Sequence, residues 1–297
     1  MKPSWQSIPE RSNLFWISLI IRIISTTGRS IAHPLLYPIA AYYVFFSTTR
    51  KASLDFLSIA LGRKADLRDF FWQLFSFSEC LLDRVLIYTG QDHLFNLEIE
   101  GLDLLEQHAR SGKGCLMVGS HLGSFEVIRV LGEIRRGLKI KALIYGESTP
   151  MITSLFKNLA PERFEDQVIM GEPKSLLGLE SHVEKGGFVA LLADRSLSTA
   201  KRIPCVFMGK PALFPEAPVR IARILNLPMV FFVCINEGRG QYRLVFEELV
   251  ASYEADAPSK QGSTAEILQD YARKLEYHSR KSPYNWFNFH DFWDVNA

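Results

Sequence analysis

The chain has 297 residues, with 34 basic against 32 acidic side chains and 47% hydrophobic residues. This length fits one large domain or two small ones, and the ordinary apolar content excludes a disordered, collagen-like or coiled-coil protein. A net charge of +2 gives no electrostatic basis for nucleic-acid binding. The cysteines lie far apart in apolar runs without paired zinc-ligand spacing, so we expect buried thiols and no metal site. They are Cys80, Cys115, Cys205 and Cys234.

Residues 1–50 combine apolar runs with basic and aromatic residues, and we expect them to form a separate membrane-associating segment. The apolar run at 14–21 is too short to cross a bilayer, and the run at 31–46 contains prolines. The flanking basic residues are Arg11, Arg22, Arg29, Arg50 and Lys51, and the interfacial aromatic residues are Trp5, Trp16, Tyr37, Tyr42 and Tyr43. This composition predicts a helical segment lying in the membrane surface, anchored to anionic head groups. A pair of buried core helices and a single membrane span are the alternatives.

Residues 51–297 are expected to form one α/β domain. The three- and four-residue spacing of apolar side chains predicts a helix from Ala65 to Tyr88. Beyond it, short apolar runs alternate with amphipathic stretches, which predicts a mostly parallel central sheet flanked by helices. The predicted strands are 115–119, 140–145, 168–170, 188–193, 229–235 and 242–246, and the predicted helices are 125–136, 151–159, 175–185, 218–225 and 264–280. The last two strands should form an antiparallel hairpin at one edge of the sheet.

One strand–turn–helix segment concentrates the residues that could do chemistry. His121 follows a predicted strand, and Glu126 lies in the first turn of the next helix. Ligands of open α/β sheets bind at the carboxyl ends of the strands, and a carboxylate on one imidazole nitrogen leaves the other nitrogen as a general base. The alternative is a turn histidine without a catalytic role, beside a glutamate that the helix dipole favours. The sequence contains no GxSxG elbow, P-loop, HExxH motif or dinucleotide-binding GxGxxG.

The segment HLGSFE resembles the His-x4-Asp/Glu signature of the lysophospholipid acyltransferase superfamily. Within that superfamily the chain is most similar to the bacterial lipid A late acyltransferases, since residues 186–195, 202–233 and 283–293 resemble three further blocks of that family. The N-terminal segment and the ending WFNFHDFW are similar to the branch that acts in aryl-polyene-type pigment pathways. The chain departs from the lipid A enzymes at residues 289–291, where a basic pair is usual, and at Asp194–Arg195, where many have a more acidic run.

The resemblance implies a glycerolipid acyltransferase-like fold and a specific reaction. A fatty or polyene acyl group would pass from an acyl thioester to a hydroxyl of a membrane lipid or glycolipid, such as a lipid A precursor, without a cofactor. His121 and Glu126 would form the general-base dyad, while Ser124, Asp194 and Arg195 would contact substrate. For Asp194, a role in orienting a catalytic residue and a strand-end cap of the next turn are the alternatives. The implied location is the cytoplasmic face of the bacterial inner membrane, with the protein peripheral or monotopic.

The donor would be acyl carrier protein or acyl-CoA. Acyl carrier protein is acidic, so a basic face would recruit it, and Arg135, Arg136 and Lys139 form such a cluster after the catalytic helix. Ordinary solvated charges are the alternative for these residues.

Two other functions fit the same residues. The dyad could activate water, which would make a thioesterase or lipid hydrolase, or the fold could serve as a non-catalytic membrane-binding scaffold. A terminal aromatic cluster is expected to pack over the core or lie on the membrane, with an acyl-chain groove as the alternative. Its members are Tyr284, Trp286, Phe287, Phe289, Phe292 and Trp293.

Overall fold

The computed structural model describes residues 21–22, 24, 26, 28–144, 150–161, 167–170, 173–195, 200–250 and 262–294. Most of the first apolar run lies outside these residues, as do Trp5, Arg11 and Trp16. Among the helices in this part of the chain, none combines the length and hydropathy that a membrane crossing requires.

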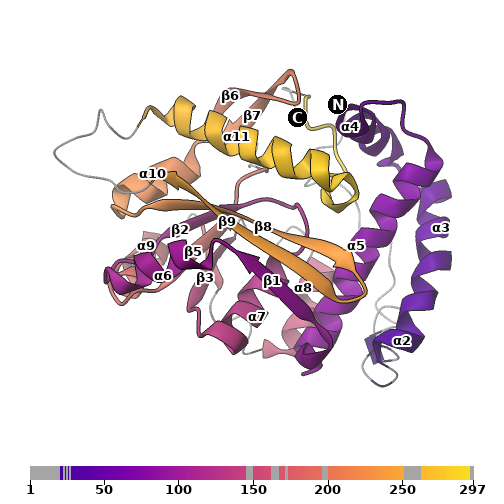
Figure 1. Ribbon diagram of the computed structural model, residues 1–297, viewed down its shortest axis with the longest axis horizontal. Coiled ribbons are helices and arrows are strands. Elements are labelled where there is room, and N and C mark those ends of the chain that lie inside the picture. Colours follow the sequence, from indigo (N-terminus) through magenta and orange to yellow (C-terminus); the bar gives the residue numbers. More distant parts are fainter. Residues whose placement is uncertain are drawn as a thin grey trace.

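A seven-stranded sheet forms the centre of the molecule, with strand order β1-β9-β8-β2-β5-β3-β4 (Figure 1). The strands β2, β3, β4, β5 and β8 are parallel, β9 is antiparallel to β8, and β1 is parallel to β9. The bounds are β1 Asn96–Glu100, β2 Leu116–Gly119, β3 Ile140–Ile144, β4 Gln167–Ile169, β5 Phe188–Leu192, β8 Met229–Gly238 and β9 Gln241–Val250. The prediction of a mostly parallel sheet in an α/β fold is confirmed.

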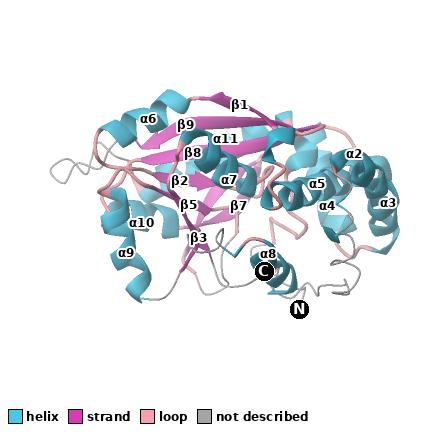
Figure 2. Ribbon diagram, turned by 90° about the horizontal axis from the view of Figure 1, so that it is seen from below, coloured by secondary structure: helices cyan, strands magenta, loops and turns pink. Residues whose placement is uncertain are grey.

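Helices flank the sheet on both faces (Figure 2). Alternate residues of β2 enter two different cores: Leu116 and Val118 join one cluster, and Met117 joins the other. This alternation follows from the two-residue period of a strand and explains why β2 is apolar throughout. The helices are α2 Arg29–Ala32, α3 Leu36–Phe46, α4 Arg50–Leu61, α5 Leu67–Tyr88, α6 Leu102–Arg110, α7 Phe125–Arg136, α8 Pro150–Leu159, α9 Pro173–Val183, α10 Ala217–Ile224 and α11 Thr264–Lys281, with a 3-10 turn η2 at His33–Leu35.

The β8–β9 hairpin forms as predicted, but its position at the sheet edge was predicted wrongly. β1 pairs with β9 and lies outside it. β1 alternates exposed and half-buried residues in the sequence NLEIE, so it lacks the continuous apolar run that marks the buried strands. Charged residues are typical of an edge strand, because they discourage pairing with another chain. A second, two-stranded hairpin joins β6 (Arg202–Phe207) to β7 (Lys210–Pro215).

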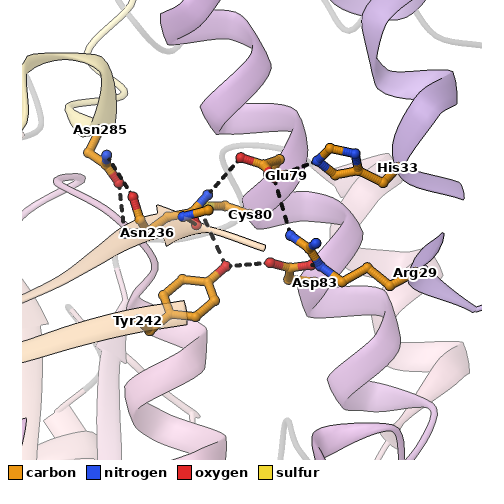
Figure 3. A network of polar contacts seen from close by, with 9 residues as sticks. Arg29, His33, Glu79, Cys80, Asp83, Asn236, Tyr242 and Asn285 are labelled. Atoms are coloured by element: carbon orange, nitrogen blue, oxygen red, sulfur yellow. Dashed lines mark hydrogen bonds and ion pairs between the residues drawn. The ribbon is translucent and has the colours of Figure 1, made fainter. Parts of the chain in front are cut away.

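A buried polar network fixes the N-terminal helices on α5 (Figure 3). The Arg29 guanidinium lies 2.9 Å from Asp83 and 3.2 Å from Glu79, and His33 Nε2 lies 2.8 Å from Glu79. Tyr242 on β9 donates a 2.9 Å hydrogen bond to the other oxygen of Asp83. The expectation that Arg29 anchors a membrane head group is therefore wrong: its charge is used inside the protein, to orient α2 and η2 on α5.

Candidate active site

The carboxyl ends of β2 and β5 bring His121 and Asp194 together. The two strands are parallel neighbours, with Gly119 opposite Leu192, so the residues that follow them share one edge of the sheet. His121 Nδ1 lies 2.8 Å from Asp194 Oδ1, and the His121 backbone N–H donates to Asp194 Oδ2 over 2.9 Å. No residue in the described part of the chain is bonded to His121 Nε2. One imidazole nitrogen is thus oriented while the other is available for chemistry.

Asp194 is held as a buried carboxylate. Its side chain is inaccessible to solvent, and Trp286 Nε1 donates a third hydrogen bond to it, 3.0 Å long, at Oδ2. Burial by itself raises the pKa of Asp194, but its interactions with His121 and the charge of Arg195 hold that pKa well below its ordinary value. The carboxylate therefore stays ionised and fixes the Nδ1–H tautomer of the imidazole.

The surroundings of His121 favour its neutral form. Burial and the nearby charge of Arg195 lower its pKa, and the attraction of Asp194 offsets this only in part. With its proton on Nδ1 and directed at Asp194, the neutral ring carries a lone pair on Nε2. This is the protonation state that a general base requires near neutral pH.

Glu126 does not orient His121 in this structure, contrary to the expectation from the sequence. Its carboxylate accepts hydrogen bonds from Tyr88 Oη at 2.5 Å and from Arg129 Nη2 at 2.8 Å, and Arg84 lies 3.6 Å away. Burial by itself raises the pKa of Glu126, but the charges of Arg84 and Arg129 outweigh this effect and the pKa is lowered to about 2. On a helix, residues three apart are neighbours, so Glu126 meets Arg129, whereas His121 lies in the preceding turn.

The turn that carries His121 is completed by the C-terminal segment. The Phe287 N–H donates to the His121 carbonyl over 2.9 Å, and the Gly123 N–H donates to the Asn285 carbonyl over 2.8 Å. Gly123 has φ +78°, and a Cβ there would lie 1.8 Å from the Cys234 carbonyl oxygen, so only glycine fits. Trp286 is buried and packs edge-on against Phe207, which confirms that the terminal aromatic cluster lies over the core.

The other predicted site residues differ in how they relate to the His121–Asp194 pair. Ser124 is buried beside the turn, with its N–H bonded to the Cys234 carbonyl over 2.8 Å, and Arg195 Nη2 donates to the Phe287 carbonyl over 2.8 Å. Lys139 is exposed. Arg135 and Arg136 belong to α7, but their side chains lie outside the described residues.

His290 is a second histidine of the site that the sequence reasoning did not select. Burial, Arg195 and His121 together lower its pKa to about 3, although the charge of Asp194 acts in the opposite direction. The signal in the sequence was the departure at residues 289–291, where the chain has Phe-His-Asp. Tyr88 and Arg84, the other partners of Glu126, come from α5 and carry no local signal.

The chain was compared with known proteins. A family model described as bacterial lipid A biosynthesis acyltransferase matches residues 4–294. This match spans the N-terminal helices, the His121 turn and the C-terminal aromatic segment. A search of the curated proteins finds no match to the chain.

Proposed function

The chain belongs to the bacterial lipid A biosynthesis acyltransferase family and is an acyltransferase, and from this premise we propose its reaction. It transfers a fatty or polyene acyl group from an acyl thioester to a hydroxyl of a membrane lipid or glycolipid. The observation that carries the proposal is the His121–Asp194 pair, 2.8 Å apart at the carboxyl edge of the sheet. An oriented, neutral imidazole is the base that activates a hydroxyl without a protein nucleophile.

The reaction needs one proton relay. His121 Nε2 removes the proton of the acceptor hydroxyl as its oxygen attacks the thioester carbonyl. The tetrahedral intermediate collapses with cleavage of the C–S bond, and the imidazolium returns the proton to the departing thiolate. Asp194 stabilises the imidazolium that forms in between. The new ester and a free thiol are the products, and His121 ends neutral.

The oxyanion of the intermediate needs donors in place before it forms. In the turn, the Gly123 and Ser124 N–H groups already serve main-chain carbonyls. The first N–H groups of α7 are the remaining donors, because the first turn of a helix has no intrahelical acceptors for them. Arg195 contributes positive charge beside His121. Ser124 takes a substrate-contacting role through its hydroxyl.

We propose the acyl donor, the acceptor and the cellular location of the reaction on the same basis. The donor is acyl carrier protein or acyl-CoA, and the docking face for the acidic carrier is formed by Arg135 and Arg136 at the end of α7 together with Lys139. The acceptor lies in the cytoplasmic face of the bacterial inner membrane. Residues 1–50 bring the domain formed by 51–297 to that surface.

The test is turnover by the purified His121→Ala variant with acyl carrier protein or acyl-CoA donors and membrane lipid acceptors. We expect a fall in kcat of roughly 10²- to 10⁴-fold with KM little changed. His93→Ala, at an exposed histidine, is the matched control and keeps full activity. Near-normal turnover in His121→Ala contradicts the proposal. Thiol release that does not require an acceptor hydroxyl assigns hydrolysis instead of transfer.

A further inference from the structure

The helix α3 is apolar on both of its faces. Leu36, Ala40 and Val44 are buried on the side that faces α5. The opposite side, continued by α2 and η2, exposes large apolar side chains: Ile31 60%, Leu35 44%, Tyr42 56%, Phe45 66% and Phe46 58%. A helix of a soluble protein carries polar residues on its outer face, and a contiguous apolar patch marks an interaction surface. We call this patch the α3 outer face.

The orientation of the α3 outer face is fixed. Figure 3 shows Arg29 and His33 pointing inward to Glu79 and Asp83 on α5. In Figures 1 and 2, α3 lies at the margin of the molecule, on the far side of α5 from the sheet. Arg29 and His33 thus contact α5, and the α3 outer face is directed away from the protein.

A basic groove lies at the end of the α3 outer face, where α3 meets α4. Its volume is about 590 Å³. The lining residues are Ser47, Thr48, Arg50, Lys51, Leu54, Asp55, Ser58, Lys64 and Ala65. Three of these side chains are cationic and one is acidic.

Two of the three cations of this groove have no ion-pair partner in the part of the chain that the structure describes. Among the described residues, none forms an ion pair with Lys51 or Lys64, and both are exposed. Arg50 Nη2 donates to the Phe45 carbonyl at the end of α3 over 2.7 Å, while Arg50 Nε is buried without a described partner. The groove therefore offers the positive charge of Lys51 and Lys64, and Arg50 connects it to the end of α3, where Phe45 is exposed.

We propose that this groove binds the phosphate of an anionic phospholipid while the α3 outer face enters the interfacial region of the bilayer. The inference rests on the membrane location proposed above, and it identifies the surface of the protein that contacts the membrane. A lipid matches both halves of the surface, since its phosphate complements the cations and its acyl chains complement the aromatic rings. The 11 residues of α3 rise about 16 Å at 1.5 Å per residue, so this helix lies along the surface.

The test is sedimentation of the full-length protein with phosphatidylcholine vesicles that contain or lack phosphatidylglycerol. We expect binding to the anionic vesicles and about tenfold or greater weakening in Lys51→Glu/Lys64→Glu. The matched control, Lys113→Glu/Lys185→Glu, makes the same change in net charge at two exposed lysines near the amino ends of β2 and β5. It should bind within about twofold of the wild type. Equal weakening of both variants overturns the groove as the site.

A second pair of variants tests the apolar half of the surface. Phe45→Ser/Phe46→Ser should bind at least about tenfold more weakly, whereas Val206→Ser/Ile224→Ser, at exposed apolar residues elsewhere, should match the wild type. Unchanged thermal unfolding shows that the variants fold. Unchanged binding by the phenylalanine variant overturns insertion of the α3 outer face.

Two further measurements distinguish the possible causes of vesicle binding. Release from the vesicles by millimolar inorganic phosphate, at constant ionic strength, assigns the groove to free phosphate and overturns the lipid. Binding is measured without an acyl donor, so it is independent of turnover. A protein that binds vesicles but transfers no acyl group contradicts the proposed function alone, and an active protein that never binds them contradicts only this inference.

Discussion

Asp194 is a fully buried carboxylate and Glu126 a largely buried one, and the two have different kinds of partner. Asp194 accepts from an imidazole, an indole and a backbone N–H, and Arg195, whose charge acts on it, directs its guanidinium to the Phe287 carbonyl. Glu126 is bonded to Arg129 and Tyr88 and faces Arg84. The first arrangement leaves an imidazole free to gain and lose a proton, whereas the second neutralises charge within the protein. The comparison indicates that the carboxylate proposed to act with His121 is identified by its hydrogen-bond partners and not by its spacing from the histidine along the chain.

The largest expected effect follows from replacing Asp194. In Asp194→Asn the side-chain amide donates to His121 Nδ1, which forces the proton onto Nε2 and removes the base. We expect kcat to fall roughly 10²- to 10⁴-fold, with the midpoint of thermal unfolding changed far less than activity. Asp103→Asn, at an exposed position of α6, serves as the control. An active Asp194→Asn enzyme would show that the pair is only structural.

Replacing Glu126 should lower the stability of the protein more than its catalytic activity. Glu126→Gln leaves the buried Arg129, 2% exposed, without its counter-charge, so the free energy of unfolding should fall by about 3 kcal/mol. The variant should retain a larger share of its kcat than Asp194→Asn. Urea unfolding measures the first quantity and steady-state kinetics the second.

The control for Glu126 is Glu106→Gln, which breaks an exposed ion pair with Arg110 and should cost below about 1 kcal/mol. If Glu126→Gln loses activity as His121→Ala does, with its stability unchanged, then Glu126 is the orienting residue that the sequence first suggested.

A smaller effect is expected from Trp286→Phe. The variant keeps the aromatic packing against Phe207 but removes one of the hydrogen bonds to the Asp194 carboxylate. A hydrogen bond to a charged group contributes about 1.5–3 kcal/mol, so we expect a loss of about 2 kcal/mol in unfolding free energy. The fall in kcat should be smaller than in Asp194→Asn, because the two contacts between Asp194 and His121 remain. A fall as large as that of Asp194→Asn would mean that Trp286 alone positions the carboxylate.

The smallest expected effect is a shift of the pH profile. Because burial and Arg195 lower the pKa of His121, kcat/KM of the wild type should decline only below the ordinary histidine value of about 6.5. Asp194 raises this pKa, so its removal in Asp194→Asn should move the acidic limb of the residual activity to still lower pH. A limb that moves to higher pH would show that another group titrates.

The sequence predicted the local features well and the distant ones poorly. The apolar runs of β5 and β8 were found because strands buried on both faces are apolar throughout, whereas β1 alternates polar residues and was missed. His121 was found because turns after strands carry ligand-binding residues. Its partner was assigned to Glu126, five residues away, while the structure uses Asp194, 73 residues away.

That error has a physical cause. Which strands are neighbours in a sheet is decided by the packing of the whole domain, and the order of strands along the chain does not state it. Only the adjacency of β2 and β5 brings Asp194 to His121. The indole of Trp286 reaches the same carboxylate from 92 residues farther along the chain, and no spacing rule anticipates such a contact.

The closing of the His121 turn by the C-terminal segment has a consequence for how the active protein forms. Helices such as α5 use contacts close in sequence and form early, whereas contacts between residues far apart in the chain carry a larger loop-closure cost. The reactive centre joins the ends of two strands to a third segment, so it exists only after all three have docked. Recovery of catalysis during refolding is accordingly a stricter measure of the native state than recovery of helical circular dichroism, and the two should separate in time.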